Sequence, residues 1–101
     1  MNFVEVCDLA ELKKNKRKVV NVNKEEIALF YLDGKVYAIN AVCPHKGGPL
    51  GEGDLDDEEV ICPWHAFMFN VKTGACLNQP ALSVRSYKVK VEGEKVKIGV
   101  D

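Results

Sequence analysis

Two short motifs contain both histidines of the chain and two of its four cysteines. The first reads Cys-Pro-His and the second reads Cys-Pro-Trp-His, with sixteen residues between them. Cysteine and histidine are the side chains that bind soft and borderline metal ions, and each motif supplies one of each. The spacing therefore predicts one metal centre with four protein ligands: Cys43, His45, Cys62 and His65.

The order of these ligands distinguishes between kinds of metal centre. Structural zinc sites commonly pair cysteine with cysteine and histidine with histidine, with the two histidines three to five residues apart on a helix. This sequence satisfies neither condition. It resembles instead the Rieske family, in which two cysteines bind one iron of a [2Fe-2S] cluster and two histidines bind the other. The resemblance covers Cys43–Leu50 (CPHKGGPL), Cys62–Phe67 (CPWHAF) and Gly74.

The resemblance implies one [2Fe-2S] cluster per chain, with Cys43 and Cys62 on the inner iron. His45 and His65 are then the ligands of the outer iron. Because each motif supplies only half of the ligands, we expect cluster binding to be coupled to the folding of this region. No catalytic residue is predicted, since a nucleophilic cysteine–histidine pair would require this ligand set to be dismantled.

The remaining cysteines are predicted to have a structural role. Four cysteines could form three alternative sets of disulfides. A reducing compartment argues against disulfides, and so does a histidine beside each of two cysteines. Cys7 and Cys76 have no such neighbour, so we interpret them as small buried apolar residues.

Length and composition predict a single soluble domain, residues 1–101. Hydrophobic residues make up 47% of the chain and charged residues 29%, as in ordinary globular proteins. The N-terminus lacks the basic and apolar regions of a signal peptide, and no apolar run approaches the length of a membrane span. We therefore expect a cytoplasmic monomer that does not bind a membrane.

The net charge of −1 is unevenly distributed. Residues 1–42 carry +1, residues 43–80 carry −4 and residues 81–101 carry +2. The acidic side chains of the middle segment form either a solvated loop or a surface that steers a basic partner toward the histidine ligands. No basic stripe with interleaved aromatic residues is present, so nucleic-acid binding is not predicted. The acidic residues are Glu52, Asp54, Asp56, Asp57, Glu58 and Glu59.

Strand patterns on both sides of residues 42–80 predict an all-β fold. β-Branched and aromatic residues are concentrated in Lys18–Val22 and Ile27–Leu32, and Asp33-Gly34 predicts a two-residue turn into a strand at Lys35–Asn40. A single helical turn capped by Asp8 is expected, followed by a basic loop at 13–18. Further strands are predicted at Phe3–Val6, Val60–Ile61, Phe67–Phe69, Ala75–Leu77 and Ser83–Glu92, and around Val96, Ile98 and Val100.

These elements predict an antiparallel sandwich or open barrel, with a cluster-binding subdomain of about residues 42–80 inserted in a β base domain. The Rieske resemblance implies the same fold. The inserted segment is rich in glycine but lacks the G-K-[ST] sequence of a phosphate-binding loop. Its glycines are predicted to let backbone N–H groups approach the cluster sulfurs: Gly47, Gly48, Gly51 and Gly53.

One-electron transfer is the function that this ligand set predicts. Histidine ligation leaves the oxidised cluster formally neutral, and four protein ligands leave no position open for a substrate. The chain resembles small ferredoxins that carry electrons from an NAD(P)H-dependent flavin reductase to the terminal oxygenase of an aromatic-ring dioxygenase. Two alternatives remain open: a small Rieske subunit of a larger oxidoreductase such as nitrite reductase, and a zinc-stabilised binding module.

The sequence also predicts a low reduction potential. Rieske proteins of quinol-oxidising complexes carry a disulfide and two hydroxyl donors around the cluster. Here Gly48 and Trp64 stand at the positions of the bridged cysteines, and Phe67 and Phe69 at those of the hydroxyl donors. We expect a potential near the low end of the Rieske range of roughly −150 to +300 mV, nearly independent of pH around neutrality.

Overall fold

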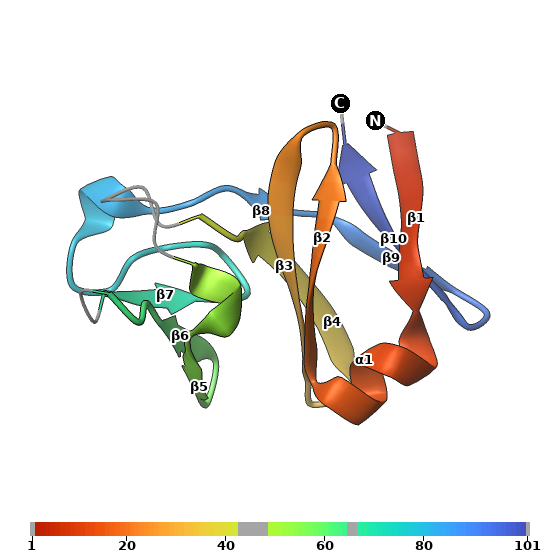
Figure 1. Cartoon of the computed structure of the whole chain (residues 1–101), viewed down its shortest axis with the longest axis horizontal. Coiled ribbons are helices and arrows are strands. Elements are labelled where there is room, and N and C mark those ends of the chain that lie inside the picture. The colour runs from red at the N-terminus through yellow and green to blue at the C-terminus, as the bar shows by residue number, and fades with distance from the viewer. Residues whose placement is uncertain (1, 43–48, 65–66, 101) are drawn as a thin grey trace.

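The computed structural model describes residues 2–42, 49–64 and 67–100. Within these residues the chain forms three antiparallel sheets, which confirms the predicted fold class; none of them closes into a barrel. Figure 1 shows the sheets side by side, with the smallest at one end of the molecule. The middle sheet has the order β2-β3-β4-β8 and contains β2 (Arg17–Val22), β3 (Glu25–Leu32), β4 (Lys35–Asn40) and β8 (Ser86–Tyr87).

Tight turns join the first three strands of the middle sheet. Asp33 and Gly34 both have positive φ, 50° and 80°, between β3 and β4. Asn23 and Lys24 repeat the pattern between β2 and β3, with φ of 51° and 67°. Two consecutive residues with positive φ are typical of the turn whose twist matches the flanking strands. The predicted Asp33-Gly34 turn is therefore confirmed.

Strand β3 is buried on both faces, which explains its nearly continuous apolar sequence. Ala28 and Phe30 face one hydrophobic core, whereas Ile27 and Leu29 face another, as the two-residue period of a strand requires. We call them core A and core B. Core A contains Ala28, Phe30, Ile39, Ala41, Leu50, Val60, Cys62, Phe69, Val71 and Cys76. Core B contains Leu12, Ile27, Leu29, Val36, Ala38, Tyr87, Val96, Ile98 and Val100.

The outer sheet covers core B. It has the order β1-β10-β9 and is built from the two ends of the described chain. Helix α1 (Leu9–Asn15) closes the same core with Leu12, which is fully buried. The strands are β1 (Asn2–Asp8), β9 (Val89–Glu92) and β10 (Lys95–Val100).

The small sheet lies on the opposite side of the middle sheet and covers core A (Figure 1). Its order is β5-β6-β7, and its residues come from the chain between β4 and β8. Two short 3₁₀ helices flank it, η1 (Leu50–Glu52) and η2 (Pro80–Leu82). The strands are β5 (Asp54–Asp56), β6 (Glu59–Ile61) and β7 (Met68–Asn70).

The N-terminal helix differs from its prediction. Helix α1 extends to Asn15 and β2 begins at Arg17, so the expected basic loop at 13–18 is wrong. The helix ends because Lys16 adopts φ of 70° and donates its backbone N–H to the Leu12 carbonyl at 2.7 Å. Asp8 precedes the helix but makes no side-chain cap; its carboxylate accepts a hydrogen bond from Lys95 Nζ at 2.6 Å.

One predicted strand is wrong, and another is divided into two. Ala75–Leu77 forms only an isolated bridge between Cys76 and Phe69, because the Cys76 N–H donates to Ser83 Oγ at 3.0 Å. The predicted strand Ser83–Glu92 divides at Lys88, where the chain passes from the middle sheet to the outer sheet. Strand β5 was not predicted, since its acidic residues were interpreted as a loop.

No helix in the described ranges is long and apolar enough to span a membrane.

Candidate metal centre

Cys62 is the one candidate ligand that lies within the described residues; Cys43, His45 and His65 lie outside them. Cys62 directly follows β6, and its residue is 1% exposed. Its backbone N–H donates to the Phe67 carbonyl at 2.8 Å, which closes the base of the second motif. The thiol is free, as expected of a ligand and not of a disulfide partner.

The base of the first motif is closed in the same way. Val42 and Pro49 form an isolated antiparallel bridge, and the Leu50 N–H donates to the Ala41 carbonyl at 2.8 Å. The described residues on the two sides of the first motif are therefore paired with each other. They lie after the end of β4 and at the start of η1.

Both bases pack against core A. Ala41 and Leu50 belong to this core from the first motif, and Cys62 belongs to it from the second. The described residues next to each motif thus lie on one core, although sixteen residues separate the motifs. A buried free thiol and two motif bases anchored on one core fit a metal centre with two ligands from each motif. The described residues by themselves include no group of three or more histidine, cysteine, aspartate or glutamate side chains that could hold a metal ion.

Of the other two cysteines, which were predicted to be buried, Cys76 is buried and Cys7 is only partly buried. Cys76 is 2% exposed and belongs to core A. Cys7 is half-buried against core B, and burial raises the pKa of its thiol. Both are free thiols in the structure.

The glycines after the first motif have a different role from the predicted one. A Cβ atom on Gly51 would lie 2.2 Å from Cγ2 of Val19, and one on Gly53 would lie 2.1 Å from the Ile61 carbonyl oxygen. The Gly53 N–H donates to the Leu50 carbonyl at 3.1 Å, so it is not free to donate to a cluster sulfur. These glycines allow η1 to pack closely against β2 and β6. Gly47 and Gly48 lie outside the described residues.

The acidic residues form a hairpin whose turn lies away from Cys62. Asp54 pairs with Ile61 beside Cys62, while Asp56 pairs with Glu59 at the other end of the two strands. Glu58, in the turn, lies 3.1 Å from Lys72 Nζ. The turn is thus partly neutralised and lies at the far end of the hairpin. This arrangement does not support the predicted steering toward the histidine ligands.

Exposed apolar side chains are present near both motifs. Trp64 in the second motif is 57% exposed, and Val42 at the base of the first is 38% exposed. Leu77, whose N–H donates to the Met68 carbonyl on β7, is 52% exposed. Large apolar side chains in water are typical of surfaces that bind another protein.

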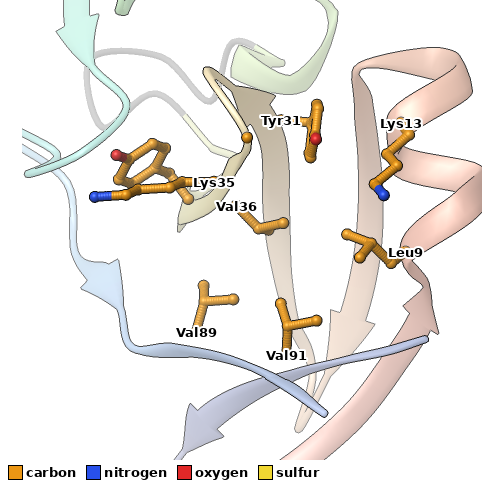
Figure 2. A pocket seen from close by; sticks show the side chains of 9 residues that line it. Leu9, Lys13, Tyr31, Lys35, Val36, Val89 and Val91 are labelled. Atoms are coloured by element: carbon orange, nitrogen blue, oxygen red, sulfur yellow. The ribbon is translucent and has the colours of Figure 1, made fainter. Parts of the chain in front are cut away.

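An open pocket of about 390 Å³ lies at a different place, between α1, the β3–β4 hairpin and β9. Figure 2 shows aliphatic side chains facing one another across it, with Lys13, Lys35 and Tyr31 around them. It contains no cysteine, histidine or carboxylate, so it is not the metal centre. The aliphatic residues are Leu9, Val36, Val89 and Val91.

Comparisons with known proteins show the family to which the chain belongs. The model of the Rieske [2Fe-2S] domain family matches residues 2–88. The ferredoxin component of the naphthalene 1,2-dioxygenase system of Pseudomonas aeruginosa is 32% identical over 97 residues, covering 95% of this chain and 93% of that protein. Apoptosis-inducing factor 3 of Mus musculus is 36% identical over 94 residues, but this chain spans only 16% of its length.

Solved structures show the same similarity along the whole chain. The ferredoxin of carbazole 1,9a-dioxygenase from Nocardioides aromaticivorans IC177 has a TM-score of 0.90 and 31% identity, and the match covers 100% of both chains. A structure described as the small subunit of an NADPH nitrite reductase has a TM-score of 0.84 and 28% identity, covering 99% of this chain and 100% of that one.

Proposed function

Since the chain belongs to the Rieske [2Fe-2S] domain family, we propose that it is an electron carrier that passes single electrons from an NAD(P)H-dependent flavin reductase to a terminal oxygenase. The observation that carries this proposal is the family match over residues 2–88, which contains both ligand motifs. Relatives of similar length support it, because they are ferredoxin components of oxygenase systems. We expect the protein to act in the cytoplasm, as a component and not as an enzyme in itself.

The proposed ligands of the one [2Fe-2S] cluster are Cys43 and Cys62 on one iron and His45 and His65 on the other. When bound, this cluster supplies reversible one-electron transfer at a potential raised by its histidine ligands. The protein holds the two motifs at closed bases and surrounds Cys62 with core A, which excludes water. We propose that the exposed side chains of Val42, Trp64 and Leu77 contact the partner proteins.

We also propose that residues 1–101 form one Rieske domain in which residues 42–80 are an inserted cluster-binding subdomain. The small sheet supports this division, because its residues lie between β4 and β8, two neighbouring strands of the middle sheet. Core A belongs to both parts, since Phe30 and Ile39 come from the middle sheet while Val60 and Phe69 come from the small one. The two parts are therefore expected to form one folding domain.

A second candidate function is that of a small subunit of a nitrite reductase, which the similar structure of such a subunit favours. The two functions differ in what the chain binds. A shuttle is a stable monomer that releases each partner, whereas a subunit remains bound to a large catalytic chain. Sedimentation of the purified protein, alone and from native extract, distinguishes them.

Iron and sulfide analysis tests the proposed cofactor. We expect two irons and two acid-labile sulfides per chain, a red-brown colour and a rhombic EPR signal after reduction. Alanine in place of Cys43, His45, Cys62 or His65 should abolish or strongly weaken cluster binding.

The matched controls are Cys7→Ala and Cys76→Ala, which remove thiols outside the proposed ligand set. They should retain the cluster and lose only packing energy, on the order of 1 kcal/mol. A colourless protein with one zinc per chain would exclude the proposal. Bleaching by Cys76→Ala but not by His65→Ala would exclude the ligand assignment.

A further inference from the structure

Arg17 connects the middle sheet to the segment between the two ligand motifs. It is the first residue of β2 and is half-buried. Its Nη1 donates to the carbonyl of Gly51 at 3.3 Å and, over a shorter distance, to that of Gly53. One guanidinium group therefore binds two carbonyl oxygens around the end of η1. Both hydrogen bonds come from the same nitrogen, so one –NH2 end of the guanidinium group holds both carbonyls.

The face of β2 that carries Arg17 lies against η1. Side chains two residues apart on a strand share a face, and Val19 contacts Gly51 on this one. Lys18, on the other face, forms an ion pair with Glu11 of α1. The strand thus directs alternate residues to η1 and to the helix.

The segment that Arg17 binds lies between the two ligand motifs in the sequence. Helix η1 begins at Leu50, whose N–H donates to the Ala41 carbonyl on the other side of the first motif. Gly53 packs against Ile61, the residue before Cys62. A shift of Gly53 would therefore change the position of both motifs.

The positive charge of Arg17 is not neutralised by a carboxylate within residues 2–42, 49–64 and 67–100. A guanidinium group keeps its charge at every pH at which the protein folds. A fixed positive charge near a redox centre stabilises the added negative charge of the reduced state.

We propose that Arg17 is a positioning residue of the metal centre, which fixes the spacing of the two ligand motifs through Gly51 and Gly53 and favours the reduced state with its charge. This inference rests on the proposed [2Fe-2S] function. It goes beyond the ligand set because it assigns a role to a residue of the base sheet.

The test compares Arg17→Gln and Arg17→Lys with Lys18→Gln, which removes the same charge from the same strand but on the face toward α1. In the cluster-containing protein, Arg17→Gln should bleach about tenfold faster in the presence of an iron chelator. Its potential should fall by about 28 mV, a threefold change at about 59 mV per tenfold. Arg17→Lys should keep most of the potential, because it keeps the charge, but still bleach faster, because the lysine side chain is shorter and its Nζ does not reach the position of Nη1. Lys18→Gln should match the wild type in both measurements.

A second measurement does not depend on the cluster. Hydrogen exchange of the Gly53 amide, which donates to the Leu50 carbonyl, should be severalfold faster in Arg17→Gln than in Lys18→Gln. Equal exchange, bleaching and potential in these two variants would overturn the inference. If the wild type binds no [2Fe-2S] cluster, the proposed function fails, and the exchange rates still decide whether Arg17 holds this segment.

Discussion

Two phenylalanines lie close to Cys62 among the described residues. Phe69 is fully buried in the same core, and the Phe67 carbonyl accepts the Cys62 N–H. Neither side chain has a hydroxyl group. At the equivalent positions of quinol-oxidising relatives, hydroxyl donors stabilise the reduced state, so their absence lowers the potential.

The substitution Phe67→Ser tests this explanation. The wild type should have a potential near the low end of roughly −150 to +300 mV, with little change between about pH 6 and about pH 8. A new hydroxyl donor should raise the potential by up to about 59 mV, which is a tenfold change for one electron. Protein-film voltammetry measures both values.

The control is Phe3→Ser, which adds a hydroxyl to an exposed position on β1 of the outer sheet. It should leave the potential unchanged. A wild-type potential well above zero, or one that falls steeply with pH near neutrality, would instead indicate a quinol-type centre.

Candidate ligands could be proposed from sequence because the chemistry of cysteine and histidine is independent of the fold; of the four, only Cys62 lies within the described residues. Arg17 could not be predicted in this way. In the sequence it belongs to a basic run, and its partners are backbone carbonyls 34 and 36 residues away. The strand pattern from residue 17 onward could have indicated that Arg17 and Val19 share one face. This pattern was missed because residues 13–18 were interpreted as a basic loop.

Among the elements, the acidic hairpin β5–β6 is stabilised by a carboxylate at its turn. Glu58 accepts a hydrogen bond from Asn70 Nδ2 at 3.0 Å and lies 3.1 Å from Lys72 Nζ. Hydrogen bonds from Lys72 and then Asn70 lower the pKa of Glu58 below its ordinary value of 4.5. The turn is therefore bound to the last residue of β7 and to Lys72, which follows that strand.

This lowered pKa predicts a pH dependence of stability. The unfolded chain binds the proton more tightly than the folded chain, so the contribution of Glu58 is complete well above the ordinary pKa of 4.5 and is lost as the pH falls below it and through the lowered pKa of the folded chain. Glu58→Gln should reduce the loss of thermal stability over this interval. The pair is exposed, so the effect is expected to be small.

Melting temperatures at a series of pH values provide the measurement. Glu26→Gln, which removes an exposed carboxylate from β3, is the matched control and should follow the wild type. If Glu58→Gln also follows the wild type, the ion pair contributes nothing to the folded state.

Elements were predictable where local chemistry determines them. The Asp33-Gly34 turn follows from two residues that tolerate positive φ. The break at Lys88 has no such local signal. Tyr87 pairs with Ala38 of the middle sheet and Val89 pairs with Ile98 of the outer sheet, so tertiary contacts decide where the strand ends.

For the whole molecule, the decisive feature is one sheet between two cores. Strand β3 contributes alternate residues to both, with Phe30 in core A and Leu29 in core B. Core B is built from regular strands and α1, and none of the described residues of the two motifs belongs to it. Core A includes Cys62 and the closed bases of both motifs, so the metal centre and this core should depend on each other.

Removal of iron should therefore destabilise the two cores unequally. The amides of Leu50 and Cys62 donate the hydrogen bonds that close the two motifs. After chelation and reduction, these amides should exchange about tenfold faster or more. Amides in the β1–β10 ladder should remain protected, because core B keeps all of its side chains without the cluster. Hydrogen exchange followed by mass spectrometry or NMR separates the two regions.

Reconstitution with iron and sulfide is the control and should restore protection at Leu50 and Cys62. Uniform loss along the chain would mean that the two cores unfold as a single unit, whereas unchanged protection at Cys62 would mean that core A forms without the metal.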